Sequence, residues 1–458
     1  MKKNMRLVGL FSAIGLLSVA LTSCNLFGNR GNGGGNNDDL SKVDLNLESD
    51  YKDTISLLIP NGNTNETTMI DELIKEFNND YPNIKFEKNY VSVSGYENTV
   101  RNQWIAKSLP DIVWSNSPDF YTLVGGEMAL PLNTFMEKSG IDLEKDYLKS
   151  FFDAGSVNGK YYCFPRSCDS VVTFINTKLL KTAGVDTSKI KNGWTWDDFM
   201  SVLAEYRAYL DKNPSTKDTY YCLDANLTGW LSVSYPMLRS YGAEVIDDNK
   251  KILIDSAETR ETLKLVKEMV EKKYIVADGI TSGNSYEMGT SPFLFQSASI
   301  SLFAERKALK DSVDIVSFPL IQKNNTPKIG AGIAGYCINS RVKDKKQVAC
   351  WKFMEKMISY EGQQAMALGG LKLPSIRKDL QDPATANWCK GYEKNNLSAY
   401  TYGDKYKITC DFLSKVETTK KAKLDEAVQG LFADAARTDK DIEKAISTCV
   451  KALKNALK

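Results

Sequence analysis

Strand-like and helix-like segments alternate along the first part of the chain, and this alternation constrains the fold more than any other feature. Residues 54–59 are an apolar run typical of a buried strand, and residues 70–77 place apolar side chains at helical spacing. A strand pattern at residues 84–87, a helix pattern at residues 96–104 and a short strand at residues 111–114 follow. Strand–helix–strand units form right-handed crossovers, so the pattern predicts an α/β fold with a mostly parallel sheet.

The alternation continues in the second part of the chain. Residues 171–175 are typical of a strand, and Thr195 with Asp198 predicts a helix start of the capping-box type, with Asp in place of the usual Glu. Further amphipathic helices are expected at residues 261–271, 347–359 and 439–453. We find no internal repeat and no internal linker, so two lobes would have to be joined by several chain crossings.

The N-terminal segment has the features of an export signal. Lys2, Lys3 and Arg6 form a basic start, and an apolar run with small residues follows at residues 7–21. The run ends in Leu21-Thr22-Ser23-Cys24, which resembles the bacterial lipoprotein box, where the cysteine is diacylated and becomes the first mature residue. The alternative is a membrane-spanning helix, but a span needs roughly 20 apolar residues. Lipidation of Cys24 would tether the body to the extracytoplasmic face of a cell membrane.

A polar segment without periodicity follows this signal. Residues 25–39 consist almost entirely of Gly, Asn, Asp and Arg, a composition typical of a flexible coil. We therefore predict a signal peptide at residues 1–23 and a lipidated, flexible tether at residues 24–50. Folded structure is expected from about Tyr51 onward.

The composition excludes several classes of function. The chain has 59 Lys and Arg against 57 Asp and Glu, and removing the signal leaves 56 against 57, so no basic face indicates nucleic-acid binding. The 458 residues include no histidine, which excludes His-based zinc sites, serine triads and Cys–His dyads. Aromatic residues make up 10% of the chain, and a hydrophobic content of 42% suffices for a core.

Eight cysteines remain once Cys24 is set aside. In an exported protein an even number permits disulfides, but eight cysteines allow 105 pairings, and the sequence does not choose among them. Their spacing is wide, which does not predict a small disulfide-dependent fold. Several are expected to be small buried hydrophobic residues, as is Cys350 on the apolar face of a helix.

Short motifs occur in a fixed order over the folded part of the chain. They are the loop and helix at residues 61–77, Pro110-Asp111-Ile112-Val113-Trp114, residues 159–166, Asn176-Thr177-Lys178-Leu179-Leu180 with Ala183-Gly184-Val185, Thr195-Trp196-Asp197-Asp198-Phe199, Phe318-Pro319, residues 330–339, and Trp351-Lys352-Phe353 with Glu361-Gly362-Gln363. Together they resemble the family-1 extracellular solute-binding proteins of ABC importers, the sugar-binding type related to maltose-binding protein. Each motif alone is weak, but their order over some four hundred residues is specific.

The resemblance implies a type II periplasmic-binding-protein fold with two α/β lobes and a ligand cleft between them. It places lobe 1 at residues 51–165 plus 320–365 and lobe 2 at residues 166–319 plus 366–458. The lobes would close around a carbohydrate by hinge motion, and the closed form would dock onto the transmembrane subunits of an ABC permease. The resemblance thus implies a monomeric binding protein without enzymatic activity, cofactor or metal.

One departure from the family pattern lies beside the expected cleft. Tyr162-Cys163-Phe164-Pro165 stands where the family usually has Gly after the Tyr. A bridge between Cys163 and Cys168 would stiffen the cleft at this point.

Three residues are the main candidates for ligand contacts. Asp169 precedes a strand where family members often place a ligand carboxylate, and the alternative is a structural cap or hinge hydrogen bond. Arg166 offers a planar set of donors for hydroxyl pairs, or else forms a salt bridge between lobes. Trp114 ends a strand whose family counterpart points into the cleft, where an aromatic face can stack on a sugar, and the alternative is core packing.

The resemblance brings further residues of the cleft segments into consideration. For each of them, core packing, capping or surface pairing is the alternative, and Glu66 in particular is expected to act as a cap partner of Asn63. These further candidates are Asn61, Asn63, Glu66, Trp230, Tyr235, Glu305, Arg306, Tyr336 and, more weakly, Trp388.

Other functions remain open from the sequence. The same receptor role could serve a non-sugar solute such as a glycerol phosphate or a polyamine, although no cluster of basic residues indicates a phosphate. Transition-metal uptake is disfavoured because histidine is absent. An exported glycosidase would need two carboxylates about 5–9.5 Å apart, for which Asp169 and Glu66 are the candidates. A surface adhesin or sensor with the same fold is a third possibility.

Overall fold

The computed structural model divides the chain into two units, residues 1–43 and residues 44–458. In the first unit, only the end is described, including a short 3₁₀ helix at Leu40–Lys42. The predicted signal peptide, Cys24 and residues 25–39 lie outside the described residues. The structure describes residues 40–60, 64–116, 119–225, 227, 231–275, 284–323, 326–369, 372–434 and 438–458.

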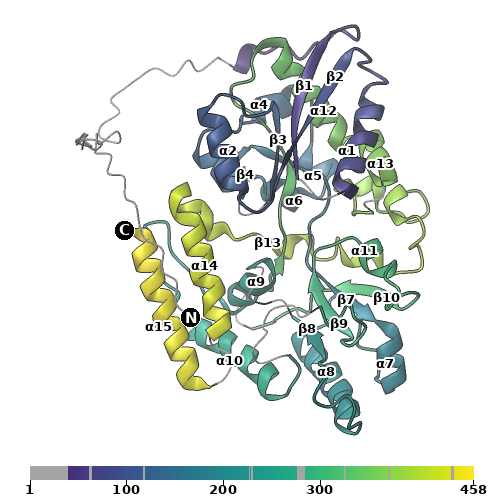
Figure 1. Cartoon of the computed structure of the whole chain (residues 1–458), viewed down its shortest axis with the longest axis vertical. Coiled ribbons are helices and arrows are strands. Elements are labelled where there is room, and N and C mark those ends of the chain that lie inside the picture. Colours follow the sequence, from purple (N-terminus) through teal and green to yellow (C-terminus); the bar gives the residue numbers. More distant parts are fainter. Residues whose placement is uncertain are drawn as a thin grey trace, which may run out of the picture. The chain divides into compact units, whose positions relative to one another are not determined.

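The first sheet of the larger unit has five strands in the order β2-β1-β3-β12-β6, of which β1, β2 and β3 are labelled in Figure 1. The first three are parallel, as the sequence predicts, whereas β12 runs antiparallel to both of its neighbours. The strands are β1 (Asp53–Pro60), β2 (Ile84–Val91), β3 (Ile112–Asn116), β6 (Cys163–Pro165) and β12 (Ala334–Ile338). The helices around them are α1 (Thr64–Phe77), α2 (Tyr96–Ile105), α3 (Asp119–Gly125), α4 (Asn133–Lys138), α5 (Leu143–Asp146), α6 (Lys149–Asp153), α12 (Asp344–Ile358) and α13 (Tyr360–Met366).

The second sheet has four strands in the order β10-β7-β9-β8. The central strand β7 is antiparallel to β10 and β9, and β8 is parallel to β9, so this sheet is mixed. The strands are β7 (Val172–Asn176), β8 (Leu223–Asp224), β9 (Phe293–Gln296) and β10 (Val313–Ser317). The helices of this part are α7 (Thr177–Ala183), α8 (Trp196–Asp211), α9 (Leu231–Tyr241), α10 (Ala257–Glu271), α11 (Ile300–Ala304), α14 (Thr418–Asp434) and α15 (Asp439–Leu457).

The predicted capping box at the start of α8 is confirmed. The Thr195 hydroxyl accepts a hydrogen bond from the Asp198 backbone N–H, and the Asp198 carboxylate accepts one from the Thr195 N–H, both at 3.1 Å. Two of the N–H groups that a helix start leaves unpaired are therefore satisfied within four residues.

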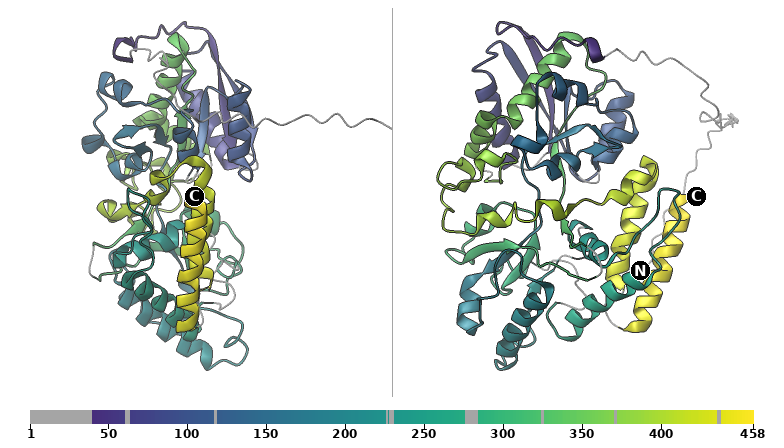
Figure 2. Two further views of the ribbon diagram at one scale, coloured as in Figure 1. Left: turned by 90° about the vertical axis from the view of Figure 1, so that its left-hand side faces the viewer. Right: turned by 180° about the vertical axis from the view of Figure 1, so that it is seen from behind.

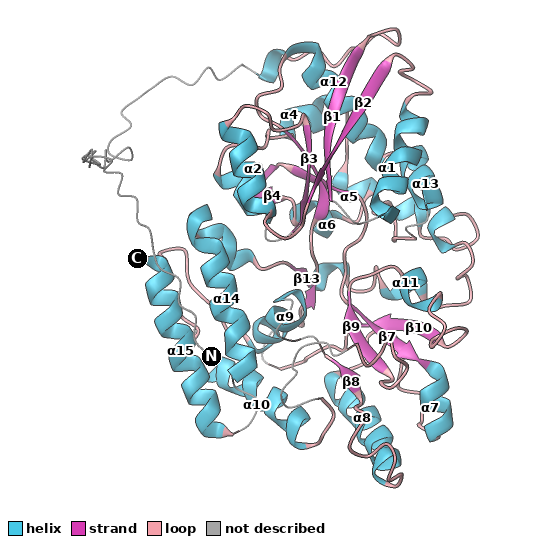
Figure 3. Ribbon diagram, in the orientation of Figure 1, coloured by secondary structure: helices cyan, strands magenta, loops and turns pink. Residues whose placement is uncertain are grey.

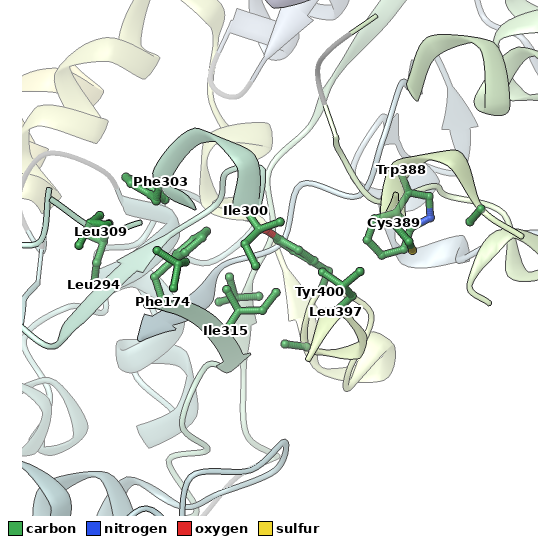
Figure 4. Packing of buried hydrophobic residues seen from close by; sticks show 14 of the residues in the cluster. Phe174, Leu294, Ile300, Phe303, Leu309, Ile315, Trp388, Cys389, Leu397 and Tyr400 are labelled. Carbon is green, nitrogen blue, oxygen red and sulfur yellow. The ribbon is translucent and has the colours of Figure 1, made fainter. Parts of the chain in front are cut away.

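A late segment of the chain completes the core of the second sheet. Figure 4 shows Phe174 and Ile315 from this sheet near Leu397 and Tyr400, which come from a 3₁₀ helix at Leu397–Ala399 and the residue after it. The Tyr400 hydroxyl donates to the Ala298 carbonyl at 2.6 Å. Farther along, α14 and α15 lie side by side as an antiparallel pair, visible at the C-terminal end of the chain in Figure 2.

Among the described residues, chain segments that pass between the two sheets are joined to one another by hydrogen bonds. The Val171 N–H donates to Gly330 at 2.8 Å, and the Gly332 N–H donates to the Asp169 carbonyl at 2.8 Å. In addition, β11 (Ile329–Gly330) pairs in parallel with β13 (Lys407–Ile408), which lies between the two sheets in Figure 3. Several crossings are therefore present, as expected, while the predicted lobe boundaries stay a prediction.

The eight cysteines of the folded part are all buried, and none is bridged in this structure. A bridge between Cys163 and Cys168 is not formed, because the Cys168 thiol donates instead to the Ser375 carbonyl at 3.0 Å. Among the described helices, none combines the length and the apolar character needed to cross a membrane.

Candidate ligand-binding site

A cavity of about 270 Å³ lies where the crossing segments leave the first sheet. Its lining comes mainly from the end of β3, the crossing segment after β6, the end of β9 and the segment before β12. Ends of strands at a change of sheet are where ligands collect in open α/β folds. The lining residues are Trp114, Asn116, Arg166, Ser167, Cys168, Asp169, Gln296, Ser297, Gly332, Ile333, Ala334 and Leu373.

Two polar atoms of the cavity lining are buried and have no hydrogen-bond partner among the described residues. They are the Trp114 indole Nε1, a donor, and the Asn116 Oδ1, an acceptor. The Trp114 ring is held edge-to-face by Tyr96, with 5.6 Å between ring centroids, and is 5% exposed. A buried polar group without a partner costs roughly 1–3 kcal/mol, so these two atoms favour a ligand that brings the complementary groups.

The Asp169 carboxylate depends on a glycine opposite it. A Cβ atom on Gly332 would lie 2.3 Å from Asp169 Oδ2, so any larger residue would push the carboxylate out of its position. Burial raises the pKa of Asp169 to about 6, and the nearby Arg166 guanidinium opposes this rise. The carboxylate is thus ionised at neutral pH but held in surroundings that weaken its hydration, which strengthens a hydrogen bond to a ligand hydroxyl.

Arg166, Glu66 and Tyr336 form one buried network. Arg166 Nε donates to both carboxylate oxygens of Glu66, at 3.0 and 2.8 Å, and the Tyr336 hydroxyl donates to Glu66 Oε1 at 2.9 Å. The Glu66 side chain is fully buried, and the Arg166 side chain is 11% exposed. Glu66 therefore orients Arg166 at the cavity wall through a buried ion pair between α1 and the crossing segment after β6.

Other predicted ligand residues do not line this cavity. Tyr235 is 1% exposed and bonds through its hydroxyl to Asp411, and Trp388 is 3% exposed and donates to the Leu380 carbonyl at 2.8 Å. Arg306 pairs with Glu287 at 2.9 Å, and Glu305 accepts a long hydrogen bond from Tyr392. Asn61, Asn63 and Trp230 lie outside the described residues.

Several cavity residues were not predicted from the sequence. Asn116 carried a usable signal, because it follows Trp114 by two residues and side chains at that spacing share a face of a strand. Gln296, Ser297 and Leu373 carried none, since only the three-dimensional topology brings their segments to the cavity.

The chemistry of the cavity is that of binding. An aromatic indole, a carboxylate, a guanidinium and amide groups suit a solute rich in hydroxyls. Glu66, the predicted partner of Asp169 in a glycosidase pair, is fully buried and paired with Arg166. Within the described ranges, no group of carboxylates and cysteines is arranged to hold a metal ion.

Two sheets joined by hydrogen-bonded crossing strands, with a polar cavity at the crossing, define a ligand-binding protein of the periplasmic-binding-protein type. The chain belongs to the family of bacterial extracellular solute-binding proteins, whose profile matches residues 72–394. The predicted resemblance and fold class are thereby confirmed, and membership in this family places the protein outside the cytoplasm.

Relatives and solved structures are similar over different lengths. The arabinooligosaccharide-binding protein of Bacillus subtilis is 25% identical over 208 residues, which is 45% of each chain, so this chain matches less than half of that relative's length. A cyclic alpha-maltosyl-1,6-maltose binding protein from Arthrobacter globiformis superimposes with a TM-score of 0.71 at 15% identity, covering 89% of this chain and 99% of that one. UgpB from Mycobacterium tuberculosis, solved with glycerophosphocholine, gives a TM-score of 0.69 at 15% identity, with coverage of 89% and 99%.

Proposed function

We propose that the protein is the substrate-binding protein of an ABC importer and that it binds an oligosaccharide in the cavity at the crossing strands. The single observation that carries this proposal is the pairing of an unsatisfied donor, Trp114 Nε1, with an unsatisfied acceptor, Asn116 Oδ1, beside an ionised carboxylate. A sugar hydroxyl is both a donor and an acceptor, so neighbouring hydroxyls can satisfy all three groups at once.

The functions of two relatives support a carbohydrate ligand. Two curated relatives, at 25% and 26% identity, are arabinooligosaccharide-binding proteins. Pentose and hexose oligomers present the same kinds of group, apolar ring faces and hydroxyls, that an indole and a carboxylate recognise.

A phosphorylated solute is the alternative that the UgpB likeness raises. Charge argues against it here, because Glu66 already neutralises Arg166 and the Asp169 carboxylate lines the same cavity. A phosphate would therefore find the Arg166 charge already neutralised by Glu66 and would be repelled by the Asp169 carboxylate. Polyamines are disfavoured for a different reason, since their ammonium groups offer no acceptor for the unpaired Trp114 indole N–H.

The remaining parts of the proposal concern the membrane. Cys24 would carry the lipid anchor, the segment after it would act as a tether, and the closed, ligand-bound form would dock as a monomer onto the permease subunits. Replacing Cys24 by Ala should release the protein from the membrane fraction, while retention of this variant on membranes would contradict lipidation at Cys24.

A thermal-shift screen of residues 42–458 tests the ligand class. The panel contains arabino-, malto- and other oligosaccharides, glycerophosphodiesters and polyamines. A ligand that binds only the folded state adds about 2.7 kcal/mol of stability at a hundredfold excess over its dissociation constant, enough to raise the melting temperature visibly. We expect a shift with one oligosaccharide class.

The controls separate this function from the alternatives. Asp248→Asn, an exposed change outside the cavity lining, should keep the shift, whereas Asp169→Asn should lose most of it. Thermal shifts seen only with phosphodiesters or polyamines would contradict the proposal that the ligand is a carbohydrate. Release of reducing ends from an oligosaccharide by the purified protein would overturn the receptor role in favour of a glycosidase.

A further inference from the structure

Two cysteines face each other directly across the first sheet. Cys163 on β6 and Cys337 on β12 are register partners in the antiparallel pair. Both side chains are buried, with 0% and 1% exposure. Burial raises the pKa of the Cys163 thiol, and the neighbouring Cys337 thiol raises it further. No other pair of cysteines is in direct register in the strands that the structure describes.

The hydrogen-bond pattern shows which kind of cross-strand pair this is. The Arg166 N–H donates to the Ala334 carbonyl at 3.1 Å, so residues 166 and 334 form a hydrogen-bonded pair of the ladder. Hydrogen-bonded and non-hydrogen-bonded pairs alternate along an antiparallel ladder, which makes Cys163 and Cys337 a non-hydrogen-bonded pair. The Cys163 N–H agrees with this, because it donates away from β12, to the Gly155 carbonyl at 3.2 Å.

Non-hydrogen-bonded pairs have the backbone spacing that a disulfide needs. Their Cα atoms lie about 4.5 Å apart, at the short end of the 4.4–6.8 Å range seen in disulfides, and their side chains lie on the same face of the sheet. The backbone can therefore accept a bond between the two sulfur atoms without a change of register.

We propose that Cys163 and Cys337 form a cross-strand disulfide in the exported protein. The family places the chain outside the cytoplasm, where disulfides form and persist. Because both thiols are buried in the folded state, the bond would have to form while the chain folds. The inference does not depend on the identity of the ligand.

The oxidant is a protein disulfide of the thiol oxidoreductase class. One cysteine thiolate attacks the oxidant's disulfide to give a mixed disulfide and one free thiol on the oxidant. The second cysteine then attacks the mixed disulfide, so the sulfur–sulfur bond forms and the oxidant leaves as a dithiol. The two protons and two electrons lost by the cysteines are those gained by the oxidant.

The bond would fasten the strands that carry the cavity network. Arg166 follows β6 and Tyr336 neighbours Cys337 on β12, and both bind the Glu66 carboxylate. A link between β6 and β12 would hold these two donors at a fixed separation. The other cysteines have different surroundings; the Cys222 thiol, for example, donates to the Leu203 carbonyl.

Peptide mapping tests the proposal on the full chain, expressed with its own N-terminus in a bacterial host and purified from the membrane. Thiols are blocked in denaturant before digestion without reductant. We expect one cross-linked peptide pair joining Cys163 and Cys337, with the other mature cysteines blocked except for lipidated Cys24. Recovery of Cys163 and Cys337 as blocked thiols, or joined to other cysteines, would overturn the proposal.

Melting temperatures give a second measurement. In oxidised protein, Cys163→Ala and Cys337→Ala each remove the same cross-link, so the double variant should lose several degrees less than the sum of the two single losses. After refolding in reductant, this shortfall should become clearly smaller, because only the packing contact between the two side chains then couples the two losses. Cys350→Ala, a buried change on α12, should cost the same in both conditions. Additive losses in the oxidised protein would contradict the bond.

Discussion

At the scale of single residues, Asp169 links stability to binding. Its pKa is raised to about 6 in the folded protein, above the value of about 4 expected in an unfolded chain. The folded state therefore binds this proton more tightly than the unfolded state does. The contribution of Asp169 to stability is full below about pH 4 and is lost as the pH rises through about 6.

The first prediction follows from the raised pKa of Asp169 in the folded state. Asp169→Asn removes a poorly solvated charge, so the free energy of unfolding at pH 8 should rise, by up to about 3 kcal/mol for a pKa shift of about two units. Ligand affinity should fall by about 10- to 100-fold, as for the loss of a hydrogen bond to a charged group. Denaturation and titration of the same variant check both effects. A variant that is less stable and still binds fully would contradict this role.

The second prediction concerns pH. The affinity of the wild-type protein for its ligand should fall as the pH drops below about 6, because Asp169 becomes protonated. The affinity of Asp169→Asn should change little over the same range. Titrations between pH 5 and pH 8 compare the two, and parallel pH profiles would show that another group controls binding.

The third prediction uses two glycines as a matched pair. Gly332→Ala should weaken binding, because the added Cβ would meet Asp169 Oδ2 at 2.3 Å. Gly430→Ala places a Cβ in open space on α14 and should stabilise the protein by up to about 1 kcal/mol through helix propensity. Equal affinities for the two variants would show that the position of the carboxylate does not matter.

At the scale of elements, the buried network ties α1 to β12 and to the segment after β6. Glu66 comes from α1, Tyr336 from β12 and Arg166 from the crossing segment, so three elements meet at one carboxylate. The arrangement holds the first turn of α1 against the end of the sheet and orients Arg166 at the cavity wall.

The fourth prediction compares two changes in this network. Glu66→Gln leaves the Arg166 charge without its buried partner and should destabilise the protein by about 3–5 kcal/mol. Tyr336→Phe removes one hydrogen bond to the same carboxylate and should cost less, about 1.5–3 kcal/mol. Chemical denaturation measures both. A smaller loss for Glu66→Gln than for Tyr336→Phe would contradict the dominance of the ion pair.

Elements were predictable from the sequence where local pattern decides them. The strand before residue 60, the strand ending near Trp114 and the cap at Thr195 all depend on neighbouring residues, and all were predicted. Trp388 and Tyr235 show the opposite case. A buried aromatic of the core and an aromatic of a cleft have the same local sequence pattern, and only tertiary packing places these two in the interior.

At the scale of the whole molecule, the crossing strands determine how the two sheets can move. The connection between the two sheets consists of several crossing segments and not of a single linker. Hydrogen bonds join these segments, at residues 166–171, 329–333 and 407–408. Such a connection permits bending about one axis and resists independent tumbling of the two parts. Because residues of the crossing segments line the cavity, we expect bending at this connection to change the separation of its walls.

The fifth prediction is a compaction on ligand binding. Small-angle scattering of residues 42–458 should show a smaller radius of gyration with saturating ligand. The Asp169→Asn variant binds more weakly and is not saturated at this ligand concentration. Its radius of gyration should therefore decrease less. An unchanged radius for the saturated wild-type protein would argue for binding without closure.

Only part of the cavity lining could be predicted from the sequence. Asp169, Arg166 and Trp114 were reachable from motifs near strand ends, and Asn116 from its spacing to Trp114. Gln296 and Leu373 reach the cavity from segments more than a hundred residues away in sequence from those motifs. Their presence depends on the crossing topology, which no local pattern encodes.

The central claim is that an oligosaccharide binds at the Trp114 end of β3, and calorimetric titration tests it most directly. The oligosaccharide that shifts the melting temperature is titrated into the wild-type protein and into Trp114→Phe, which keeps an aromatic ring and removes the indole N–H. The account predicts saturable heat at one site in the wild-type protein and an affinity at least about tenfold lower in the variant. Equal affinities in the two proteins, or no heat in the wild type, would contradict it.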